Sequence, residues 1–377
     1  MAVEIREIPP VRGQIKKFVT YPIDHLYRDH KYYVPPLIMD EVNTLLPDEN
    51  PAFEFCESVY FMAYRDGKPV GRIAGIINRL VNERSGKQEG RFSCVDFIDD
   101  DEVVDALFKA VSDWARGKGM TCLTGPLGFT DMDREGMLVV GYDEMGTQAT
   151  YYNYPYYVTQ MERMGFVKDV DWLEFKVIVP EQVPEKMARV SKLVKERLGV
   201  DTIKYTSRKA LVRDYGDAIF KLINNAYDSL FGYSPLSEKQ IKHYIKMYLP
   251  FLPLEDLSMV VKPDGELIGV GITIPSMSKA LIKCRGRLFP TGWYHLLKAF
   301  KGHNDVVDLL LIAVKPEYQN KGVNALFFND LIPYFNKFGY KWAESGHELE
   351  LNTQVLKQWD YFEREQHKRR RAFTKEL

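Results

Sequence analysis

Residues 305–339 constrain the fold most, because they join an apolar strand pattern to a helical pattern through one short polar loop. Residues 306–314 are β-branched or apolar almost throughout, which is typical of a buried central strand. Pro316 ends this strand, since proline has no N–H to give to the ladder. Aromatic and aliphatic side chains then recur at helical spacing up to Phe338, and Pro333 inside that run predicts a kink or a later helix start.

The polar loop between this strand and this helix has the composition of a phosphate-binding turn. Gln319 offers an amide donor, Lys321 a positive charge, and Gly322 lets the backbone approach an anion closely. The first N–H groups of a helix have no intrahelical partner and lie at the positive end of its dipole. The order of strand, polar loop and helix therefore predicts a site for a diphosphate group.

This loop resembles motif A of the GNAT superfamily of N-acetyltransferases. The family pattern is Gln or Arg, two residues, Gly, one residue, then Gly or Ala; here Asn324 stands at the last position. The resemblance implies that acetyl-CoA, as co-substrate, is bound by Gln319, Asn320, Lys321, Gly322, Val323 and Asn324. It also implies that the main chain of Ile312, Ala313 and Val314 faces the thioester, and that the Val314 N–H polarises its carbonyl.

A second part of the resemblance concerns protonation of the leaving thiolate. Many GNAT proteins carry an Asn-x-x-Ala-x-x-x-Tyr pattern whose Tyr supplies this proton; here the positions hold Asn352, Val355 and Trp359. Tryptophan cannot act as a general acid. Either Tyr361 takes the role, or solvent protonates the thiolate, because a thiol of pKa ~8.5 leaves without help. Asn352 is a candidate for a CoA contact, a helix cap, or both.

The reaction also needs a base, because an acceptor amine of pKa ~10 is mostly protonated. The candidates are Asp308 on the central strand, and Glu344, Glu348 and Glu350 on an expected strand at residues 340–351. A period of two places these three glutamates on one face. His347 lies among them on the opposite face, and the chain has no HExxH motif, so we predict no metal site.

A repeated order of elements predicts the domain organisation. The 377 residues favour about two domains, and a β-hairpin with an Asp-Gly turn occurs in each half, at Asp66-Gly67 and Asp264-Gly265. We predict an α/β fold of two GNAT-like domains, each a mixed, mainly antiparallel sheet flanked by helices. The expected ranges are 1–180, a connector helix in 181–200, and an acyl-CoA-binding domain in 201–377.

The first copy is expected to be degenerate. It lacks the Gln-x-x-Gly loop, and the helix after its central strand begins with Asp99, Asp100 and Asp101. Three carboxylates at this position would repel a pyrophosphate.

Composition excludes several partners. Net charge is −1, which gives no overall field for nucleic acid or an anionic membrane. Four scattered cysteines predict free thiols in a reducing compartment, and no apolar run is long enough to cross a bilayer. We expect a cytoplasmic protein with no nucleic-acid or membrane partner; a homodimer stays open. We interpret the basic run at residues 368–371 as a solvated or subunit-facing strand edge.

These observations predict an N-acetyltransferase that moves acetyl from acetyl-CoA to a small-molecule or peptide amine by direct attack in a ternary complex. One alternative is a Fem-like aminoacyl transferase using aminoacyl-tRNA, which the near-zero net charge disfavours. Another is a catalytically inactive GNAT scaffold or CoA sensor, which the departures at Asn324 and Trp359 favour. The length of the acyl chain stays open.

Overall fold

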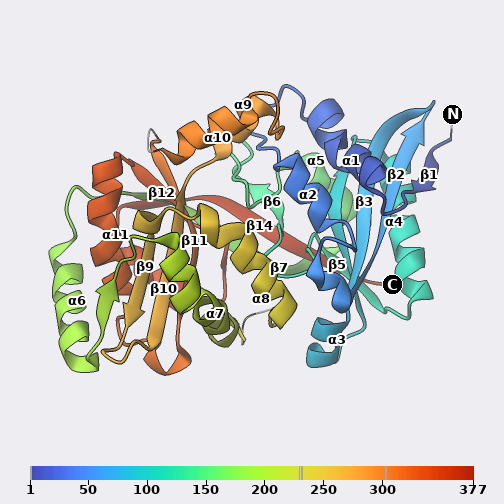
Figure 1. Cartoon of the computed structure of the whole chain (residues 1–377). Helices are drawn as coiled ribbons and strands as arrows, with labels where there is room; N and C mark the ends of the chain where they lie inside the picture. The colour runs from blue at the N-terminus through green and yellow to red at the C-terminus, as the bar shows by residue number, and fades with distance from the viewer. Residues whose placement is uncertain (1, 229, 231, 302–303) are drawn as a thin grey trace. The chain divides into compact units, whose positions relative to one another are not determined.

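The structure is a computed structural model that describes residues 2–228, 230, 232–301 and 304–377 (Figure 1). It divides into two compact units. Unit 1 comprises Met1–Leu173, Met277–Leu296 and His367–Leu377, and unit 2 comprises Glu174–Ser276 and Leu297–Gln366. Each unit has a mainly antiparallel sheet flanked by helices, so the predicted α/β class is confirmed.

The sheet of unit 1 has the strand order β1-β2-β3-β4-β5-β14. Neighbouring strands are antiparallel except β4 and β5, which are parallel. The strands are β1 (Glu4–Glu7), β2 (Cys56–Arg65), β3 (Lys68–Asn78), β4 (Glu89–Phe97), β5 (Cys122–Gly125) and β14 (Arg364–Glu376), with β6 (Met137–Val140) also paired to β14. The helices are α1 (Arg12–Tyr21), α2 (Ile38–Thr44), α3 (Arg79–Ser85), α4 (Asp101–Gly117), α5 (Tyr156–Arg163) and α9 (Ser278–Cys284).

The sheet of unit 2 has the order β8-β9-β10-β11-β12-β7, again with a single parallel pair, β11 and β12, among its described neighbours. The strands are β8 (Asp201–Ile203), β9 (Leu257–Val261), β10 (Leu267–Pro275), β11 (Val306–Val314), β12 (Trp342–Glu344) and β7 (Val167–Ile178), with the short β13 (Glu348–Leu349) also paired to β7. The helices are α6 (Glu185–Leu198), α7 (Arg208–Tyr227), α8 (Glu238–Tyr248), α11 (Asn324–Phe338) and α12 (Thr353–Lys357), and α10 (Gly292–Phe300) begins in the unit 1 segment and ends in unit 2.

Both predicted hairpins are present, and in each unit the helix that connects the two parallel strands packs against the same hairpin position. A Cβ on Gly71 of β3 would lie 2.7 Å from Leu107 Cδ1 of α4. A Cβ on Gly269 of β10 would lie 2.7 Å from Phe327 Cζ of α11. Each glycine therefore lets a large side chain of the helix pack close to the strand backbone. This shared contact is the structural counterpart of the repeated sequence pattern.

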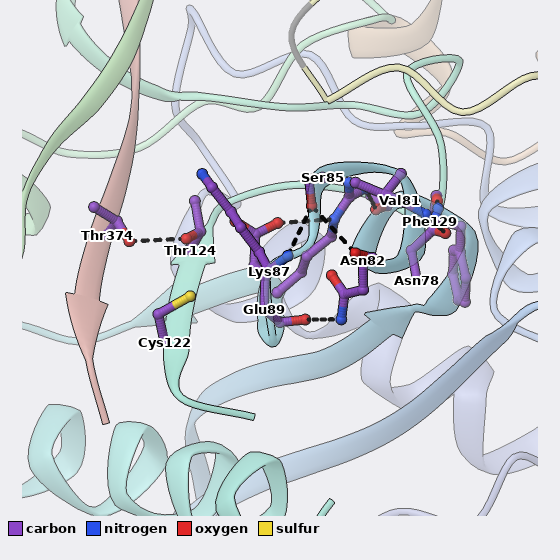
Figure 2. Close-up of polar contacts among 12 residues, drawn as sticks. Asn78, Val81, Asn82, Ser85, Lys87, Glu89, Cys122, Thr124, Phe129 and Thr374 are labelled. Carbon is purple, nitrogen blue, oxygen red and sulfur yellow. Dashed lines mark hydrogen bonds and ion pairs between the residues drawn. The ribbon is translucent and has the colours of Figure 1, made fainter. Parts of the chain in front are cut away.

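The last strand of the chain closes unit 1. β14 pairs with β5, with Phe373 opposite Gly125. Figure 2 shows the hydroxyls of Thr374 and Thr124 facing each other across this pair, 2.9 Å apart. In unit 2, the end of β7 takes the equivalent place, with Val177 opposite Ala343 of β12. The sequence pattern predicted that β7 closes the N-terminal domain and β14 the C-terminal one. Pairings between residues so far apart in the chain leave no local signal that could have shown the actual partners.

The basic run at residues 368–371 therefore lies in a strand with neighbours, and its interpretation as a solvated or subunit-facing edge is wrong. Lys368 and Arg370 are fully buried. Lys368 Nζ donates to the Met145 carbonyl at 3.1 Å, and Arg369 and Arg371 both bind the buried carboxylate of Asp171. Each cation is kept inside the unit by an oxygen partner.

The connection between β3 and β4 is held by asparagine side chains (Figure 2). Asn78 accepts a hydrogen bond from the Val81 N–H at 3.0 Å, capping α3, and donates to the Phe129 carbonyl at 2.8 Å. Asn82 donates to the Glu89 carbonyl at 3.0 Å. These bonds satisfy backbone groups where the chain leaves β3 and enters β4.

Helices that have a capping side chain in the sequence begin at that residue in the structure. Asp100 accepts from the Val103 N–H and begins α4, as its aspartates predict. Ser237 and Gln240 form a capping box at the start of α8. Helix α1 ends at Tyr21, where Pro22 begins a short π-helix. Helices α9 and α10 have no counterpart among the predicted elements.

Candidate functional site

Strand β11 has an open edge in its second half. β12 pairs with it at Val306, Val307 and Asp308 only. On the other side, the register with β10 shifts at Ile272 and Thr273, which leaves Leu310 as the extra residue of a bulge. Within the described part of the chain, residues 311–314 of β11 thus run beyond the parallel pairing with β12.

The hydrogen-bond alternation of β11 fixes which main-chain groups face this edge. Lys315 donates its N–H to the Ile268 carbonyl directly opposite, at 2.9 Å. In an antiparallel pair, hydrogen-bonded and non-hydrogen-bonded positions alternate, so Val314 and Ile312 form non-bonded pairs with β10. Their N–H and C=O groups therefore point to the open edge, while those of Ala313 point into the sheet. The Tyr227 hydroxyl, which donates to the Ile312 carbonyl at 3.0 Å, agrees with this assignment.

The loop after β11 forms a tight turn before α11. Pro316–Tyr318 make one 3-10 turn, and Asn320 and Gly322 both have left-handed φ, +62° and +82°. Backbone of alternating hand can form an anion-binding concavity. No side chain among the described residues caps α11. Its first N–H groups therefore remain oriented along the helix axis. The helix starts at Asn324 and includes Pro333, so it does not begin later.

Gln319 and Gly322 both have structural partners in this turn. Gln319 Nε2 donates to the Val314 carbonyl at 3.1 Å, so its amide braces the loop against the strand. A Cβ on Gly322 would lie 3.1 Å from Val194 and 3.2 Å from Val190 of α6. The helix predicted as a connector therefore packs against the turn. Sequence patterns did not show this contact, which depends on tertiary packing.

Two asparagines connect the turn to the region after β13. Asn324 Nδ2 donates to Gln358 Oε1 at 3.1 Å. Asn352 accepts from the Val355 N–H at 3.3 Å and caps α12, so the predicted cap is confirmed. Asn324 thereby ties the start of α11 to the 3-10 turn Gln358–Tyr361.

Trp359 and Tyr361 lie in different surroundings. Trp359 is buried, and its indole N–H donates to both carboxylate oxygens of Glu348, at 3.0 and 2.8 Å. Tyr361 is 42% exposed, and the Lys186 ammonium lies 4.8 Å from its ring centroid. The structure therefore places Trp359 against a carboxylate and Tyr361 against α6.

The acidity of Glu348, in β13, is altered by its surroundings. Burial raises its pKa to about 7, although the hydrogen bond from Trp359 and the charge of Arg364 act in the opposite direction. Burial also raises the pKa of Tyr227, and the charge of Glu348 adds to this effect. Glu348 is thus within electrostatic reach of the hydroxyl that binds the Ile312 carbonyl. A carboxyl that titrates near neutrality suits proton transfer.

Asp308 and Glu344 form the last pair of the parallel register, at the point where the β11–β12 pairing ends. They are buried and stand opposite each other in the β11–β12 register. Asp308 precedes Val314 by six positions, or roughly 20 Å along a strand. The strand predicted at residues 340–351 is two short strands separated by residues 345–347. The prediction that Glu344, Glu348 and Glu350 share one strand face is therefore wrong, since the period of two is interrupted.

A cavity of about 540 Å³ opens beside the start of the turn. It is lined by Asn224, Asn225, Asp228, Pro235, Pro316 and Glu317. Asn224 Oδ1 accepts from the Leu236 N–H at 2.8 Å and from the Tyr233 hydroxyl at 2.7 Å, which holds the segment after α7 in place. The cavity lies on the α7 side of the β11 end and is lined mainly by polar residues.

In unit 1, side chains of α5 occupy the end of the equivalent strand, β4. The Phe97 N–H donates to the Tyr157 hydroxyl at 3.1 Å, and the Tyr156 hydroxyl donates to the Phe97 carbonyl at 2.6 Å. The main-chain groups of Phe97 are thereby satisfied within the unit.

The comparison with solved structures identifies the fold. The chain resembles a tandem GNAT protein from the clavulanic acid biosynthesis pathway, solved without AcCoA, with a TM-score of 0.58, 12% identity, and 99% of this chain and 98% of that chain covered. This chain has a tandem GNAT fold. A probable N-acyltransferase of Enterococcus faecalis V583 gives a TM-score of 0.51 at 6% identity, over 100% of this chain and 72% of that chain. No family model matches the sequence.

Two curated proteins are similar to this tandem GNAT chain in sequence. One is a bacterial ceramide synthase of Caulobacter vibrioides, 27% identical over 309 residues, which cover 81% of this chain and 79% of that protein. The other is Protein YghO of Escherichia coli K12, 26% identical over 376 residues, with 97% and 94% covered.

Two searches of the described residues gave negative results. No described helix combines the length and the apolar character needed to cross a membrane. No three His, Cys, Asp or Glu side chains among these residues form a group that could hold a metal ion.

Proposed function

We propose that this protein is an N-acyltransferase that takes its acyl group from a CoA thioester and transfers it to an amine. The observation that carries the proposal is the open edge of β11, with the main-chain groups of Ile312 and Val314 facing outward, followed directly by the uncapped turn of α11. A diphosphate would bind at residues 319–324, where Lys321 adds a positive charge. A pantetheine arm would then hydrogen-bond along β11.

The chemistry requires an oxyanion donor and a base. The Val314 N–H is the proposed donor to the thioester oxygen, because its carbonyl already accepts from Gln319 while its N–H faces the open edge. We assign proton removal to Glu348 in preference to Asp308 and Glu344, because burial raises the pKa of Glu348 to about 7 and its charge acts on Tyr227, whose hydroxyl binds the Ile312 carbonyl. The amine nitrogen attacks the carbonyl carbon, the new C–N bond replaces the C–S bond, and solvent protonates the departing thiolate.

The name of one relative narrows the substrate class. That relative is a bacterial ceramide synthase, and a ceramide is the amide of a fatty acid with a long-chain amino alcohol. We therefore propose a long-chain amine as acceptor and a fatty acyl-CoA as donor. Acetyl-CoA with a small-molecule or peptide amine is the alternative that the same experiment decides.

Only unit 2 is proposed to bind CoA. In unit 1, Tyr156 and Tyr157 satisfy the main-chain groups of Phe97, and Asp100 caps the helix that follows. Both features oppose an anionic, strand-like ligand at this position.

The test is an acyl-transfer assay with purified protein. Acetyl-CoA and palmitoyl-CoA are each offered with a long-chain 2-amino-1,3-diol and with a short alkylamine, and both free thiol and amide product are measured. The proposal expects an amide that forms only when thioester and amine are both present, with the long-chain pair preferred. Acetylation of the short amine alone would favour the alternative. If the protein binds CoA but forms an amide with none of the amines tested, it is a catalytically inactive CoA-binding scaffold. If it does not bind CoA, the proposal is wrong.

A further inference from the structure

Helix α10 and the turn before it expose a cluster of large apolar side chains. Phe289 is 74% exposed, Trp293 50%, Tyr294 53% and Leu297 44%. Positions 293, 294 and 297 lie within one turn of the same helix flank, and Phe289 precedes Trp293 by four residues. Isolated exposed apolar residues are common, but a contiguous aromatic group on one helix usually marks a contact surface.

The segment that carries this cluster is strongly basic. Residues 276–301 contain no Asp or Glu and six basic residues: Lys279, Lys283, Arg285, Arg287, Lys298 and Lys301. The whole chain has a net charge of −1, so the positive charge is local. The expectation of no membrane partner rested on the whole-chain value, which averages this segment away.

Contacts at its base hold the segment in place. Arg287 Nη2 donates to both carboxylate oxygens of Asp24, at 2.8 and 3.0 Å, and Arg285 donates to the Ile23 carbonyl at 2.9 Å. The Trp293 indole N–H donates to the Pro290 carbonyl at 3.0 Å, which orients the ring. The two arginines are thereby used inside the protein, whereas Lys298 and Lys301 are exposed at the end of α10.

We propose that α10 and the turn at residues 288–291 bind the surface of an anionic lipid bilayer. Tryptophan and tyrosine rings favour the headgroup region, where the apolar face is buried and the polar edge stays hydrated. Lysines beside them pair with anionic headgroups, and their stems lie over apolar surface. A helix of nine residues is too short to span a bilayer but suits an interfacial position.

A lipid surface fits these observations better than an acidic protein groove. Three of the four exposed apolar side chains are aromatic, and the formal charges of residues 276–301 are all positive. This inference stands without the proposed acyl transfer. If both hold, the surface would bring the protein to the bilayer in which a long-chain amine resides.

The test is co-sedimentation of the full chain with vesicles of phosphatidylcholine alone or mixed with phosphatidylglycerol. We expect binding to the anionic vesicles that is at least tenfold tighter than to the neutral ones. The double variant Phe289→Ser, Trp293→Ser should bind anionic vesicles at least tenfold more weakly than wild type. The matched control is Tyr248→Ser, Phe251→Ser, which removes two aromatic side chains of similar exposure at the end of α8.

The charge contribution is tested with Lys298→Glu, Lys301→Glu, against Lys192→Glu, Lys209→Glu at exposed sites outside the segment. Only the first pair should weaken binding. Thermal unfolding of each variant confirms that it is folded. The inference would be overturned if wild-type protein did not bind anionic vesicles. It would also be overturned if the Phe289/Trp293 double variant and the Tyr248/Phe251 control bound them with equal affinity. Loss of acyl transfer with vesicle binding retained would count against the proposed function only.

Discussion

Trp359 stands where many GNAT proteins carry a tyrosine, and the structure gives it a different partner. Its indole N–H binds both oxygens of Glu348, a carboxyl whose pKa burial raises to about 7. A tyrosine at this position would offer a proton to a leaving group, whereas tryptophan can only donate a hydrogen bond. The substitution therefore coincides with a positioned carboxylate, and we assign to that carboxylate the proton transfer that the amine requires.

Replacing Glu348 by Gln tests this assignment. The carboxylate form is the base, so wild-type kcat/KM should rise as pH increases through about 7. Glu348→Gln should lower kcat/KM by roughly 10²- to 10⁴-fold and remove the rise near pH 7. The control is Glu350→Gln, a neighbouring carboxylate outside β13. Equal rates and equal pH profiles for wild type and Glu348→Gln would exclude the role.

Asp256 predicts a pH dependence of stability in unit 2. It is buried, and burial raises its pKa to about 7, with Glu255 acting in the same direction and Lys204 against it. Because the folded-state pKa exceeds the unfolded value of ~3.9, the neutral form stabilises the fold at low pH, and this stability is lost as pH rises through about 7. The loss is about 1.4 kcal/mol for each unit of pKa difference, as an upper bound.

The variant Asp256→Asn keeps the neutral form at every pH. We expect its thermal midpoint to exceed that of wild type at pH 8 and to approach it at pH 5. Asp217→Asn, at an exposed position of α7, serves as the control. A wild-type advantage at pH 8 would show that the ionised carboxylate is the stabilising form and would refute the argument.

At the scale of elements, the basic run of the last strand, β14, contributes to the stability of unit 1. β14 completes the unit 1 sheet next to β5, and Asp171 receives hydrogen bonds from Arg369 and Arg371 of that strand at 2.7 to 3.0 Å. Asp171 is fully buried and binds the guanidinium groups of both arginines. The basic run is thereby explained as a clamp inside unit 1.

Replacing Asp171 by Ala should therefore be strongly destabilising. The substitution removes the charge-assisted hydrogen bonds to two guanidinium groups, each bond worth about 1.5–3 kcal/mol, although the side chains of Arg369 and Arg371 keep 32% and 25% of their surface exposed. Asp113→Ala, which removes an exposed partner of Lys109 and Arg116 on α4, should cost less than about 1 kcal/mol. Urea unfolding followed by circular dichroism compares the two, and similar losses would contradict the clamp.

The sequence predicted those elements whose turn residues, helix caps or hydrophobic periodicity are visible within a few residues. The Asp-Gly hairpins, the Asp100 cap and the apolar run of β11 were predicted because turn chemistry and periodicity act over a few residues. The exchange of closing strands, the contact of α6 with Gly322 and the pairing of Trp359 with Glu348 depend on groups far apart in the chain. Helix α10 was missed because much of its apolar surface is exposed and follows no core periodicity, and α9 was missed because its seven residues are too few for a clear pattern. The predicted boundaries at residues 180 and 200 stay a prediction.

At the scale of the whole molecule, one arrangement occurs twice and only one copy keeps an open strand edge. In both units a helix connects the two strands of a parallel pair. Tyr156 and Tyr157 bind both main-chain groups of Phe97 at the end of β4, whereas the N–H groups of Ile312 and Val314 in β11 face the open edge and only their carbonyls accept from side chains. The account therefore predicts one CoA site in each chain, in unit 2. In unit 1, the carboxylate of Asp100 caps the helix after β4, and Tyr156 and Tyr157 bind the main chain of Phe97. Both features make a second CoA site in unit 1 unfavourable.

Calorimetric titration of acyl-CoA into wild type and two glycine variants tests this claim most directly. Gly322→Ala changes the turn itself; Gly339→Ala, at the other end of α11, has a similar left-handed φ and an open environment, and so controls for backbone strain. We predict one site per chain, binding weakened at least tenfold in Gly322→Ala, about 1.4 kcal/mol, and wild-type affinity in Gly339→Ala. Two sites per chain, or equal affinity in all three folded proteins, would contradict the account.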